Sequence, residues 1–403
     1  MSRDLYDLFS PRFKADPFPT YAAMRRDHPI YRHTAPDGRV IWYMTRYEDI
    51  SAVLRDDLRF GKDPVLAKAG SEGSVKLPKL GSTINDNMLF SDPPDHTRLR
   101  ALVNQAFTPR RVAAMTGRIQ DTAEGLLEKC LKDGMADLIS TYALPLPVVV
   151  ISDLLGIPAH DRDVVAQWSQ AIISPGNRGL TYRGRKQNIR AFIHYLRDLF
   201  VQRQIDPQDD LITALVQAEE AGERLGETEL LSMIALLLVT GHETTVNLIG
   251  NGTLALLRHP EQQERLRADP SLWPRAVEEL LRFDGPVETS TSRWVRRDTI
   301  FKGHHMAGGE LVRAAIASAN RDADYFDRPD DLDVGRKDNR HLAFGLGTHY
   351  CLGAPLARLE GLIALETLFR RLPDLRLRTA VDDLTWRSGT LLRGMACLPV
   401  AWK

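Results

Sequence analysis

The sequence predicts a mainly α-helical protein with small β-sheets. Apolar residues recur at helical spacing through most of residues 111–200, and one helix of about 30 residues is expected from Glu227 to Arg258. Strand patterns are short, and the clearest is Val40–Met44 (VIWYM), which is rich in β-branched and aromatic residues. Because no Gly/Ser-rich or Pro-rich linker divides the chain, we expect a single domain over residues 1–403.

The remaining elements follow from the same periodicities and from turn residues. In chain order, the sequence predicts a helix at Phe18–Arg26, a helix at Tyr47–Arg55, an irregular segment at 60–90, a helix starting near Asp92, a Gly-rich basic break at 173–185, hairpins at Thr299–Ala317, and short strands from Leu375 with a tip near Ser388–Arg393. Irregular segments as long as the first one are usually functional or mobile, and the alternative is a surface loop of no consequence. The break at 173–185 is expected to join two helices that form a lid.

Composition narrows the class of protein. The formal net charge is zero, which gives no support for nucleic-acid binding. Three scattered cysteines are too few for a disulfide framework and fit a reducing compartment. The first residues contain no apolar core for a signal peptide or membrane anchor, and the longest apolar run is shorter than the roughly 20 residues that span a bilayer. We therefore expect a cytoplasmic protein that does not bind membranes.

One stretch near the C-terminus, 344–353 (FGLGTHYCLG), places Cys351 between closely spaced glycines and directly before a helical pattern. Unpaired N–H groups and the helix dipole at that position favour a thiolate over a thiol. Gly345 and Gly347 allow a tight loop that can lie against something flat, and Phe344 can shield the sulfur. Such a thiolate suits an axial ligand of haem iron. The alternative is a buried structural cysteine; zinc is disfavoured because the chain has no Cys-x-x-Cys pair.

Three further patterns carry chemistry. His96 and Arg100 lie four residues apart, on one helix face, and suit a dianionic ligand; the alternative is a solvated face. The segment 240–245 (TGHETT) interrupts an apolar helix with a glycine, an acid and hydroxyls, as functional sites do. Gly241 is expected to let the helix widen locally; the alternative for the acid is an ion pair in the core. Glu279 and Arg282, one helical turn apart, form either a buried structural pair or an ordinary surface pair.

Taken in the order of the chain, with the cysteine loop last, these four patterns resemble the motifs of the cytochrome P450 superfamily. The cysteine loop fills every fixed position of its haem signature, F-G-x-G-x-H-x-C-x-G. The resemblance extends over nearly the whole chain and implies the cytochrome P450 fold with haem b (iron protoporphyrin IX) as cofactor and Cys351 as the metal ligand. The other cofactor-binding residues that it implies are His96, Arg100, Arg293, Phe344, Gly345, His349 and Gly353.

The resemblance also implies roles for residues outside the haem loop. Glu243 and Thr244 are expected to be the catalytic proton relay. The residues expected to line the substrate pocket are Thr240, Gly241, Val287 and Leu391. Arg336 is expected to complete a structural triad with Glu279 and Arg282. Thr240 departs from the family pattern, which has Ala or Gly there, and its extra hydroxyl and methyl affect the shape of the pocket.

The function that the resemblance implies is a soluble, bacterial-type haem-thiolate monooxygenase of secondary metabolism. It would insert one oxygen atom of O2 into an apolar small molecule, by hydroxylation or epoxidation. No dinucleotide-binding fingerprint is present, so electrons are expected from a separate ferredoxin or flavodoxin with its NAD(P)H reductase, which would meet a basic face near Arg110, Arg111 and Arg358. A monomer is expected. The alternatives are a peroxide-dependent peroxygenase, an isomerising haem-thiolate enzyme and a non-catalytic haem sensor, and Glu243 and Thr244 favour the monooxygenase.

Overall fold

The computed structural model describes residues 5–63, 87–173, 181–220 and 222–402. The chain forms two compact units. We call the first the sheet unit; it comprises Met1–Ser74, Ala123–Ala143 and Thr244–Lys403. The second, the helical unit, comprises Val75–Thr122 and Leu144–Glu243. Each unit is described by itself, and the single domain expected from the sequence stays a prediction.

The main sheet of the sheet unit is built around the strand Val40–Met44. Within the described residues it has five strands in the order β1-β2-β10-β7-β3. Their bounds are β1 Ile30–Thr34, β2 Val40–Met44, β10 Leu311–Ala314, β7 Arg293–Val295 and β3 Phe60–Gly61. β2 pairs antiparallel with β1 (Ile30↔Met44) and parallel with β10 (Leu311↔Ile41). A non-local parallel pairing of this kind brings the N-terminal segment against residues near 311.

Both faces of β2 are buried, which explains its continuous apolar sequence. Ile41 and Tyr43 pack in one core cluster with residues of α1 (Pro11–Ala15) and α2 (Phe18–Asp27). Trp42 and Met44 point to the other face and pack with residues of α3 (Tyr47–Arg55). The sheet is therefore sandwiched between helices that come directly before and after its first two strands.

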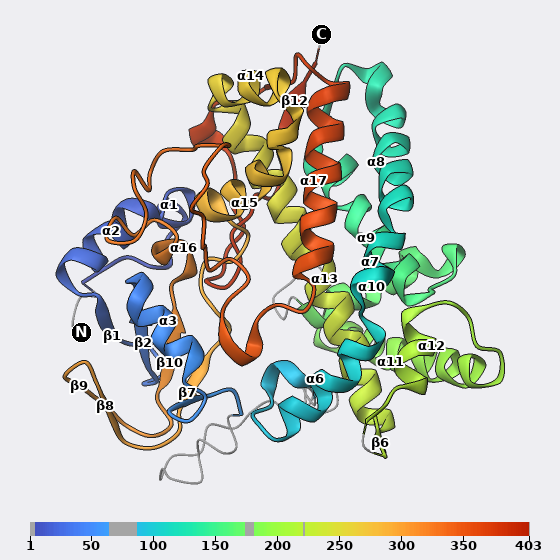
Figure 1. The fold of residues 1–403 in the computed structure, drawn as a ribbon, viewed down its shortest axis with the longest axis horizontal. Coiled ribbons are helices and arrows are strands. Elements are labelled where there is room, and N and C mark those ends of the chain that lie inside the picture. The colour runs from blue at the N-terminus through green and yellow to red at the C-terminus, as the bar shows by residue number, and fades with distance from the viewer. Residues whose placement is uncertain (1–4, 64–86, 174–180, 221, 403) are drawn as a thin grey trace. The chain divides into compact units, whose positions relative to one another are not determined.

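Smaller strands complete the sheet unit. A three-stranded sheet has the order β11-β12-β4, and β8 and β9 form a separate hairpin. Their bounds are β4 Met135–Asp137, β8 Thr299–Phe301, β9 His304–Met306, β11 Arg376–Leu377 and β12 Pro399–Ala401. The other helices of this unit are α14 (Pro260–Ala268), α15 (Trp273–Asp284), α16 (Ile316–Ala319) and α17 (Ala354–Arg371). α15 and α17 pack against each other, and the loop before α17 carries Cys351 (Figure 1).

The helical unit is almost entirely α-helical. Its helices are α6 (Asp95–Ala106), α7 (Pro109–Ala114), α9 (Pro145–Leu155), α10 (Arg162–Ile173), α11 (Tyr182–Ile205) and α12 (Leu211–Gln217), and a short hairpin is formed by β5 (Glu219–Glu220) and β6 (Glu223–Arg224). Two helices, α8 (Thr116–Cys130) and α13 (Glu227–Leu257), run from one unit into the other. Short 3₁₀ and π turns occur in both units. Those of the helical unit are η2 (Met88–Phe90) and η5 (Ala159–Asp161), and those of the sheet unit are η3 (Leu131–Asp133), η4 (Ile139–Ala143), η6 (Pro270–Leu272), η7 (Gly347–His349) and η8 (Val381–Asp383).

The predicted fold class is confirmed, and so are most of the predicted elements. β2 and α3 have the predicted bounds, while α2 and α13 each differ from the prediction by one residue at the end. The predicted break at 173–185 is too long, because Thr181 accepts a hydrogen bond from the Gly184 N–H and starts α11 at Tyr182. The break does join two helices, α10 and α11, and their role as a lid stays a prediction. The middle of the break, 174–180, and most of the long irregular segment expected at 60–90, namely 64–86, lie outside the described residues.

The longest uninterrupted apolar run of α13 is short, as predicted, but the helix as a whole is long and mostly apolar. By length and composition alone this helix could cross a membrane. However, 67% of its most apolar window is buried inside the protein, as it is in the core helices of soluble proteins. We therefore interpret α13 as a core helix.

Candidate functional site

The loop that carries Cys351 folds back on itself before α17 begins. The Cys351 N–H donates to the Phe344 carbonyl at 2.9 Å, and the Tyr350 N–H donates to the Gly347 carbonyl at 3.0 Å. Gly353 caps the N-terminus of α17, and Pro355 lies in the first turn, where its missing N–H costs nothing. Cys351 is exposed and precedes the helix by three residues. The loop thus presents a thiol at a helix N-terminus, where an anion is stabilised.

Two glycines make this loop possible. Gly345 and Gly347 have φ angles of +70° and +75°, in the left-handed region that favours glycine. Gly347 also lies against the chain that leaves α3. A Cβ at this position would be 2.6 Å from the Leu54 carbonyl oxygen, well inside van der Waals contact. Backbone therefore packs directly on backbone at the base of the cysteine loop.

A charged cluster holds the Phe344 side of the loop. Arg358 donates to both carboxylate oxygens of Glu278, at 2.7 and 2.9 Å, and His341 lies 3.2 Å from the same carboxylate. The Arg358 guanidinium also stacks over the Phe344 ring, 4.4 Å from its centroid, and donates to the Tyr350 hydroxyl at 3.2 Å. Arg358, which was expected to be a free docking charge, is therefore neutralised by Glu278 and is part of the loop's support.

The electrostatics of Glu278 reflect this cluster. Burial alone would raise its pKa, but hydrogen bonds from His341 and Arg358 outweigh burial and lower the pKa to about 2. The carboxylate hydrogen bond in turn raises the pKa of Arg358. Both groups stay charged at neutral pH, so the support for Phe344 is an ion pair rather than a neutral contact.

A second carboxylate, that of Glu279, binds the other two members of the predicted triad, Arg282 and Arg336. Arg282 donates to both of its oxygens at 2.8 Å, and Arg336 donates to one oxygen at 3.0 Å. The Asp333 N–H and the Asn339 amide also donate to Glu279, at 2.9 and 3.2 Å. Both residues of the Glu279–Arg282 pair are fully buried, so the additional hydrogen bonds are what make the pair tolerable there.

Arg282 and Arg336 extend this network along the segment that leads to the cysteine loop. Arg282 donates to the carbonyls of Asn320, Pro329 and Asp331 at 2.6–3.0 Å. Arg336 donates to the Asp327 carbonyl at 2.8 Å. An irregular segment has few backbone partners of its own, so these side chains satisfy carbonyls that would otherwise be buried without a donor. The network thereby fixes the path of residues 320–339.

The side chain of Arg293, which was predicted to bind a haem propionate, makes its hydrogen bonds within the protein. It lies on β7, is fully buried, and donates to Asp57 and to the Phe60 carbonyl, both at 2.8 Å, and to the Leu54 carbonyl at 3.1 Å. Its charge is thus balanced within the protein by Asp57. Contact with a haem propionate remains a prediction for Arg293.

Helix α13 has one open face in the middle of an otherwise buried surface. Leu236, Val239, Glu243 and Thr244 are partly exposed and Thr240 is exposed, whereas most of the residues between them are buried. This spacing of three and four residues defines a single stripe along the helix. The stripe is a surface of this helix that the protein itself does not cover.

Within this stretch the structure corrects one expectation. The sequence suggested that Gly241 lets the helix widen locally, but residues 240–245 are α-helical throughout. A Cβ at Gly241 would lie 3.1 Å from the Ile151 Cδ1 of α9, so the glycine admits a neighbouring helix instead. The Thr240 hydroxyl donates to the Leu236 carbonyl at 2.8 Å, which leaves its methyl group to shape the open face.

The remaining predicted residues fall into two places. His96 and Arg100 both lie on α6 in the helical unit; His96 is buried and Arg100 is partly exposed. Val287 and Leu391 lie on neighbouring segments of the sheet unit, because Val287 forms a β-bridge with Leu392. Val287 is partly exposed and Leu391 is 40% exposed, so this pair of segments presents apolar side chains that the protein does not bury.

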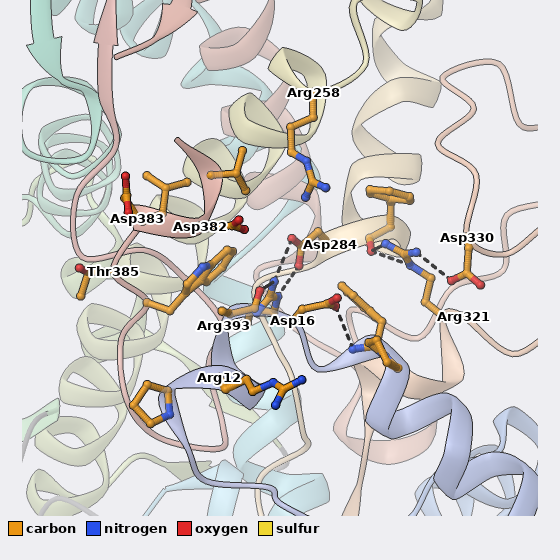
Figure 2. Close-up of a pocket in the computed structure, with 18 of the residues that line it drawn as sticks. Arg12, Asp16, Arg258, Asp284, Arg321, Asp330, Asp382, Asp383, Thr385 and Arg393 are labelled. Carbon is orange, nitrogen blue, oxygen red and sulfur yellow. Dashed lines mark hydrogen bonds and ion pairs between the residues drawn. The ribbon is translucent and has the colours of Figure 1, made fainter. Parts of the chain in front are cut away.

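A cavity of about 960 Å³ lies elsewhere on the sheet unit (Figure 2). Charged residues of α1, the end of α13 and the segment 381–386 line it, together with Arg393 and Asp284. None of the residues predicted for the site lines it. We therefore do not assign the reaction to this cavity.

Comparison with known proteins identifies the family. The Cytochrome P450 family model matches residues 151–373. The polyketide biosynthesis cytochrome P450 PksS of Bacillus subtilis is 43% identical over 100% of this chain and 99% of its own length. The chain belongs to the cytochrome P450 family.

Two further cytochromes P450, one relative compared by sequence and one solved structure, are similar to this chain over nearly its whole length. The mycinamicin IV hydroxylase/epoxidase of Micromonospora griseorubida is 39% identical over 95% of this chain and 94% of its own length. The solved structure of myxobacterial cytochrome P450 CYP267B1 in complex with myristic acid superimposes with a TM-score of 0.89 at 41% identity, over 98% of both chains. This chain is accordingly a cytochrome P450 monooxygenase.

Haem b is the cofactor of this family, and the residues of this chain fit it. Cys351 is exposed at the start of α17, where a metal-binding thiolate is favoured. Gly345 and Gly347, which have positive φ angles, carry no side chains and so leave the loop bare at two points. The stripe of α13 presents apolar and hydroxyl-bearing side chains that are partly or fully exposed.

Sequence reasoning missed several residues that position the site. Glu278 holds Arg358 and His341, Asp57 balances Arg293, and the Asn320 side chain accepts from the Leu342 N–H at 2.8 Å. Each partner is distant in the sequence, so no local spacing indicates the contact. One weak signal was present for Glu278, which is adjacent to Glu279 on the same helix.

We predict that Glu278→Gln destabilises the protein by about 2 kcal/mol at pH 7, because the folded state holds this carboxylate charged. The folded pKa is depressed to about 2, so the carboxylate contributes stability above its ordinary pKa and loses it as the pH falls. The difference between wild type and variant should therefore shrink between about pH 4.5 and pH 2. Urea unfolding at several pH values measures it, with Glu264→Gln, an exposed site on α14, as the control. A difference that does not change with pH would contradict this assignment.

We also predict that Gly347→Ala costs about 3 kcal/mol and lowers the haem content of the purified protein. The alanine would be strained at positive φ and would clash with the Leu54 carbonyl. The matched control is Gly38→Ala, which has a φ of +83° but open space around the Cβ, and should cost about 1 kcal/mol without haem loss. Equal effects of the two substitutions would show that the contact with Leu54 is not limiting.

Proposed function

We propose that this cytochrome P450 hydroxylates or epoxidises an apolar, polyketide-type small molecule at the open face of α13. The observation that carries the proposal is the exposed Cys351 at the start of α17, inside a loop that fills the whole haem signature. PksS and the mycinamicin enzyme, which act in or on polyketide chemistry by their names, support the substrate class. The apolar side chains of Val287, which is partly exposed, and Leu391, which is exposed, suit such a substrate.

The roles of the residues follow from their chemistry. Haem, when bound, supplies the iron at which dioxygen is activated. Cys351 would hold the iron through Sγ, with Phe344 limiting the access of water to the sulfur. His96, Arg100, Arg293 and His349 are the cationic or hydrogen-bonding groups that would pair with the propionates, while Gly345 and Gly353 would let the backbone lie close.

Glu243 and Thr244 would move protons. Both lie on the partly exposed stripe of α13, with Glu243 one residue before Thr244. A carboxylate can take a proton from water and release it, which suits Glu243 to resupply the site. The Thr244 hydroxyl can donate and accept at once, so it can hold a proton at Oγ1 and pass it toward the oxygen-binding side.

The substrate pocket would be formed by Thr240, Gly241, Val287 and Leu391. Thr240 is exposed on the helix, and its hydroxyl is bonded to its own helix at Leu236. It would therefore contribute bulk more than a polar contact. Compared with the Ala or Gly usual in the family, that bulk narrows the pocket beside the helix.

Bacterial cytochromes P450 take electrons from separate redox partners and bind small-molecule substrates. We propose a ferredoxin or flavodoxin with its NAD(P)H reductase as the partner, and a cytoplasmic monomer as the working form. Arg358 is neutralised by Glu278 and Arg111 lies 3.4 Å from Asp209, so neither is an isolated charge. Docking would therefore depend more on Arg110 than on those two residues.

The sequence left three alternatives to the monooxygenase reaction: a peroxide-dependent peroxygenase, an isomerising haem-thiolate enzyme and a non-catalytic haem sensor. A peroxygenase needs no relay for activating dioxygen, and neither does a sensor, whereas this chain has Glu243 and Thr244 on the open stripe. Turnover that requires both dioxygen and NAD(P)H-derived electrons supports the monooxygenase. Turnover with hydrogen peroxide alone would favour the first alternative.

We predict that Cys351→Ala abolishes the thiolate signature in the carbon monoxide difference spectrum of the reduced protein. Alanine removes the only sulfur in the haem signature loop. Cys397→Ala is the matched control and should leave the spectrum unchanged. An unchanged spectrum in Cys351→Ala would rule out this axial ligand.

We predict that Thr244→Ala keeps NAD(P)H consumption but diverts it to hydrogen peroxide, so that product per NAD(P)H falls several-fold. The helix persists because alanine is the best helix former. Glu243→Gln should slow turnover more than it uncouples it, because it loses the titratable group. Thr245→Ala, a buried neighbour, is the control, and Thr240→Ala with Thr244→Ala should uncouple more than Thr244→Ala alone. Full coupling in both Thr244 variants would exclude a relay through this helix.

A further inference from the structure

A buried ion pair contacts the two chain segments that carry Val287 and Leu391. The Lys14 ammonium of α1 contacts the Glu288 carboxylate, and their side chains are only 4% and 1% exposed. The Tyr21 hydroxyl of α2 donates to the other Glu288 oxygen at 3.1 Å. The Lys14 ammonium also donates to the Leu392 carbonyl at 3.3 Å. The N-terminal helices thus reach two segments near the other end of the chain at one point.

Burying the two charges of this ion pair costs free energy that an apolar contact between α1 and the same segments would not cost. Burial lowers the pKa of Lys14 and raises the pKa of Glu288, and the pairing only partly offsets it in each case. Buried ion pairs seldom stabilise a fold more than apolar residues of the same size would. Phe13 on α1 already packs into the core, so attachment alone does not require the charges. What the pair supplies beyond attachment is a fixed geometry.

The two segments that Lys14 contacts are joined to each other. We call Pro286–Thr289 and Thr390–Arg393 the wall pair. The Glu288 N–H donates to the Leu391 carbonyl at 2.9 Å, the Thr289 hydroxyl donates to the Thr390 carbonyl at 2.8 Å, and Val287 bridges Leu392. Side chains alternate along extended chain, so Glu288 points to α1 while its neighbour Val287 points away. A shift in Glu288 would therefore shift Val287.

A second contact fixes the other end of the wall pair to the same helix. Arg393 donates to Asp284 at 2.6 Å and to the carbonyls of Lys14 and Ala15, and its guanidinium stacks over Trp386 at 3.8 Å. Figure 2 shows this guanidinium and Asp284 facing each other beside the surface cavity. Lys14 therefore contributes both its ammonium and its carbonyl to positioning the wall pair.

We propose that the buried Lys14–Glu288 pair is a positioning device that sets where Val287 and Leu391 stand in the substrate pocket, and hence which substrates and which atoms of them the pocket accepts. The inference rests on the proposed function, because it takes the wall pair to face the substrate. Lys14 and Glu288 touch no substrate; they act through the side chains on the opposite side of the wall pair.

The test uses the haem-loaded protein and two nitrogen ligands of the iron. Imidazole is too small to report on the wall, and 4-phenylimidazole carries a ring that extends from the iron into the pocket. The ratio of their dissociation constants, measured from the shift of the haem absorption band, reports the position of the wall independently of turnover. The variants are Lys14→Met, Glu288→Gln and the double change of both residues to Met. Lys302→Met is the control, since Lys302 pairs with the buried carboxylate of Asp49 away from the wall.

We expect Lys14→Met and Glu288→Gln to change the ratio by about threefold or more, with the carbon monoxide difference spectrum unchanged. Lys302→Met should leave the ratio unaltered even where it lowers thermal stability as much. The double variant with Met at both positions should recover thermal stability, but its ratio of dissociation constants should still differ from wild type. If the pair were merely structural, the ratio would return to the wild-type value together with the stability. Lys14→Arg keeps a charge and should fall nearest to wild type, and it serves as the readable variant if Glu288→Gln does not fold.

Val287→Ala and Leu391→Ala separate the inference from the function on which it rests. If either changes the ratio while the Lys14 and Glu288 variants do not, the positioning role is wrong and the wall assignment stands. If neither changes the ratio, the wall pair does not face the ligand, and the pocket assignment and the inference both fail. The monooxygenase assignment would survive both results, because it rests on Cys351.

Discussion

The carboxylate of Glu279 connects the helices of the sheet unit to the loop that carries Cys351. It is fully buried, and two arginines, one amide and one backbone N–H donate to it. Such a carboxylate would be prohibitively costly without these donors. Arg282 lies on the same helix as Glu279, and the other three donors, Arg336, Asn339 and the Asp333 N–H, belong to the irregular segment that precedes the loop. The two carboxylate oxygens of Glu279 need hydrogen bonds, and the donors that provide them fix the path of the chain that leads to Cys351 at the start of α17.

The same logic recurs twice nearby. Glu278 holds Arg358 over Phe344, and Asp57 holds Arg293 on β7 of the main sheet. In each case a charged group is paired within the protein and is therefore held in one geometry. Rigid surroundings of this kind suit a site whose ligand atom must stay in place. By contrast, the stripe of α13 with Thr240, Glu243 and Thr244 is left open, as a face that receives ligands must be.

Local pattern was sufficient to predict what local chemistry determines. The period of the apolar residues gave α3 and β2 with their observed bounds, and the glycine spacing in 344–353 indicated the tight loop that positive φ angles confirm. Contacts between distant residues were not predictable. Arg358 was taken for a free surface charge because its partner, Glu278, lies on another helix, and nothing in the sequence pairs Lys14 with Glu288. Gly241 was misjudged for the same reason, since the residue it makes room for, Ile151, is on another helix.

The central claim is that Cys351 supplies the sulfur that binds the haem iron, and X-ray absorption at the iron edge tests it most directly. The purified haem-loaded protein should show one sulfur neighbour of the iron in addition to the nitrogens of the porphyrin. That sulfur should disappear from the spectrum of Cys351→Ser while the nitrogens remain. A wild-type spectrum without sulfur, or a Cys351→Ser spectrum that retains it, would contradict the account.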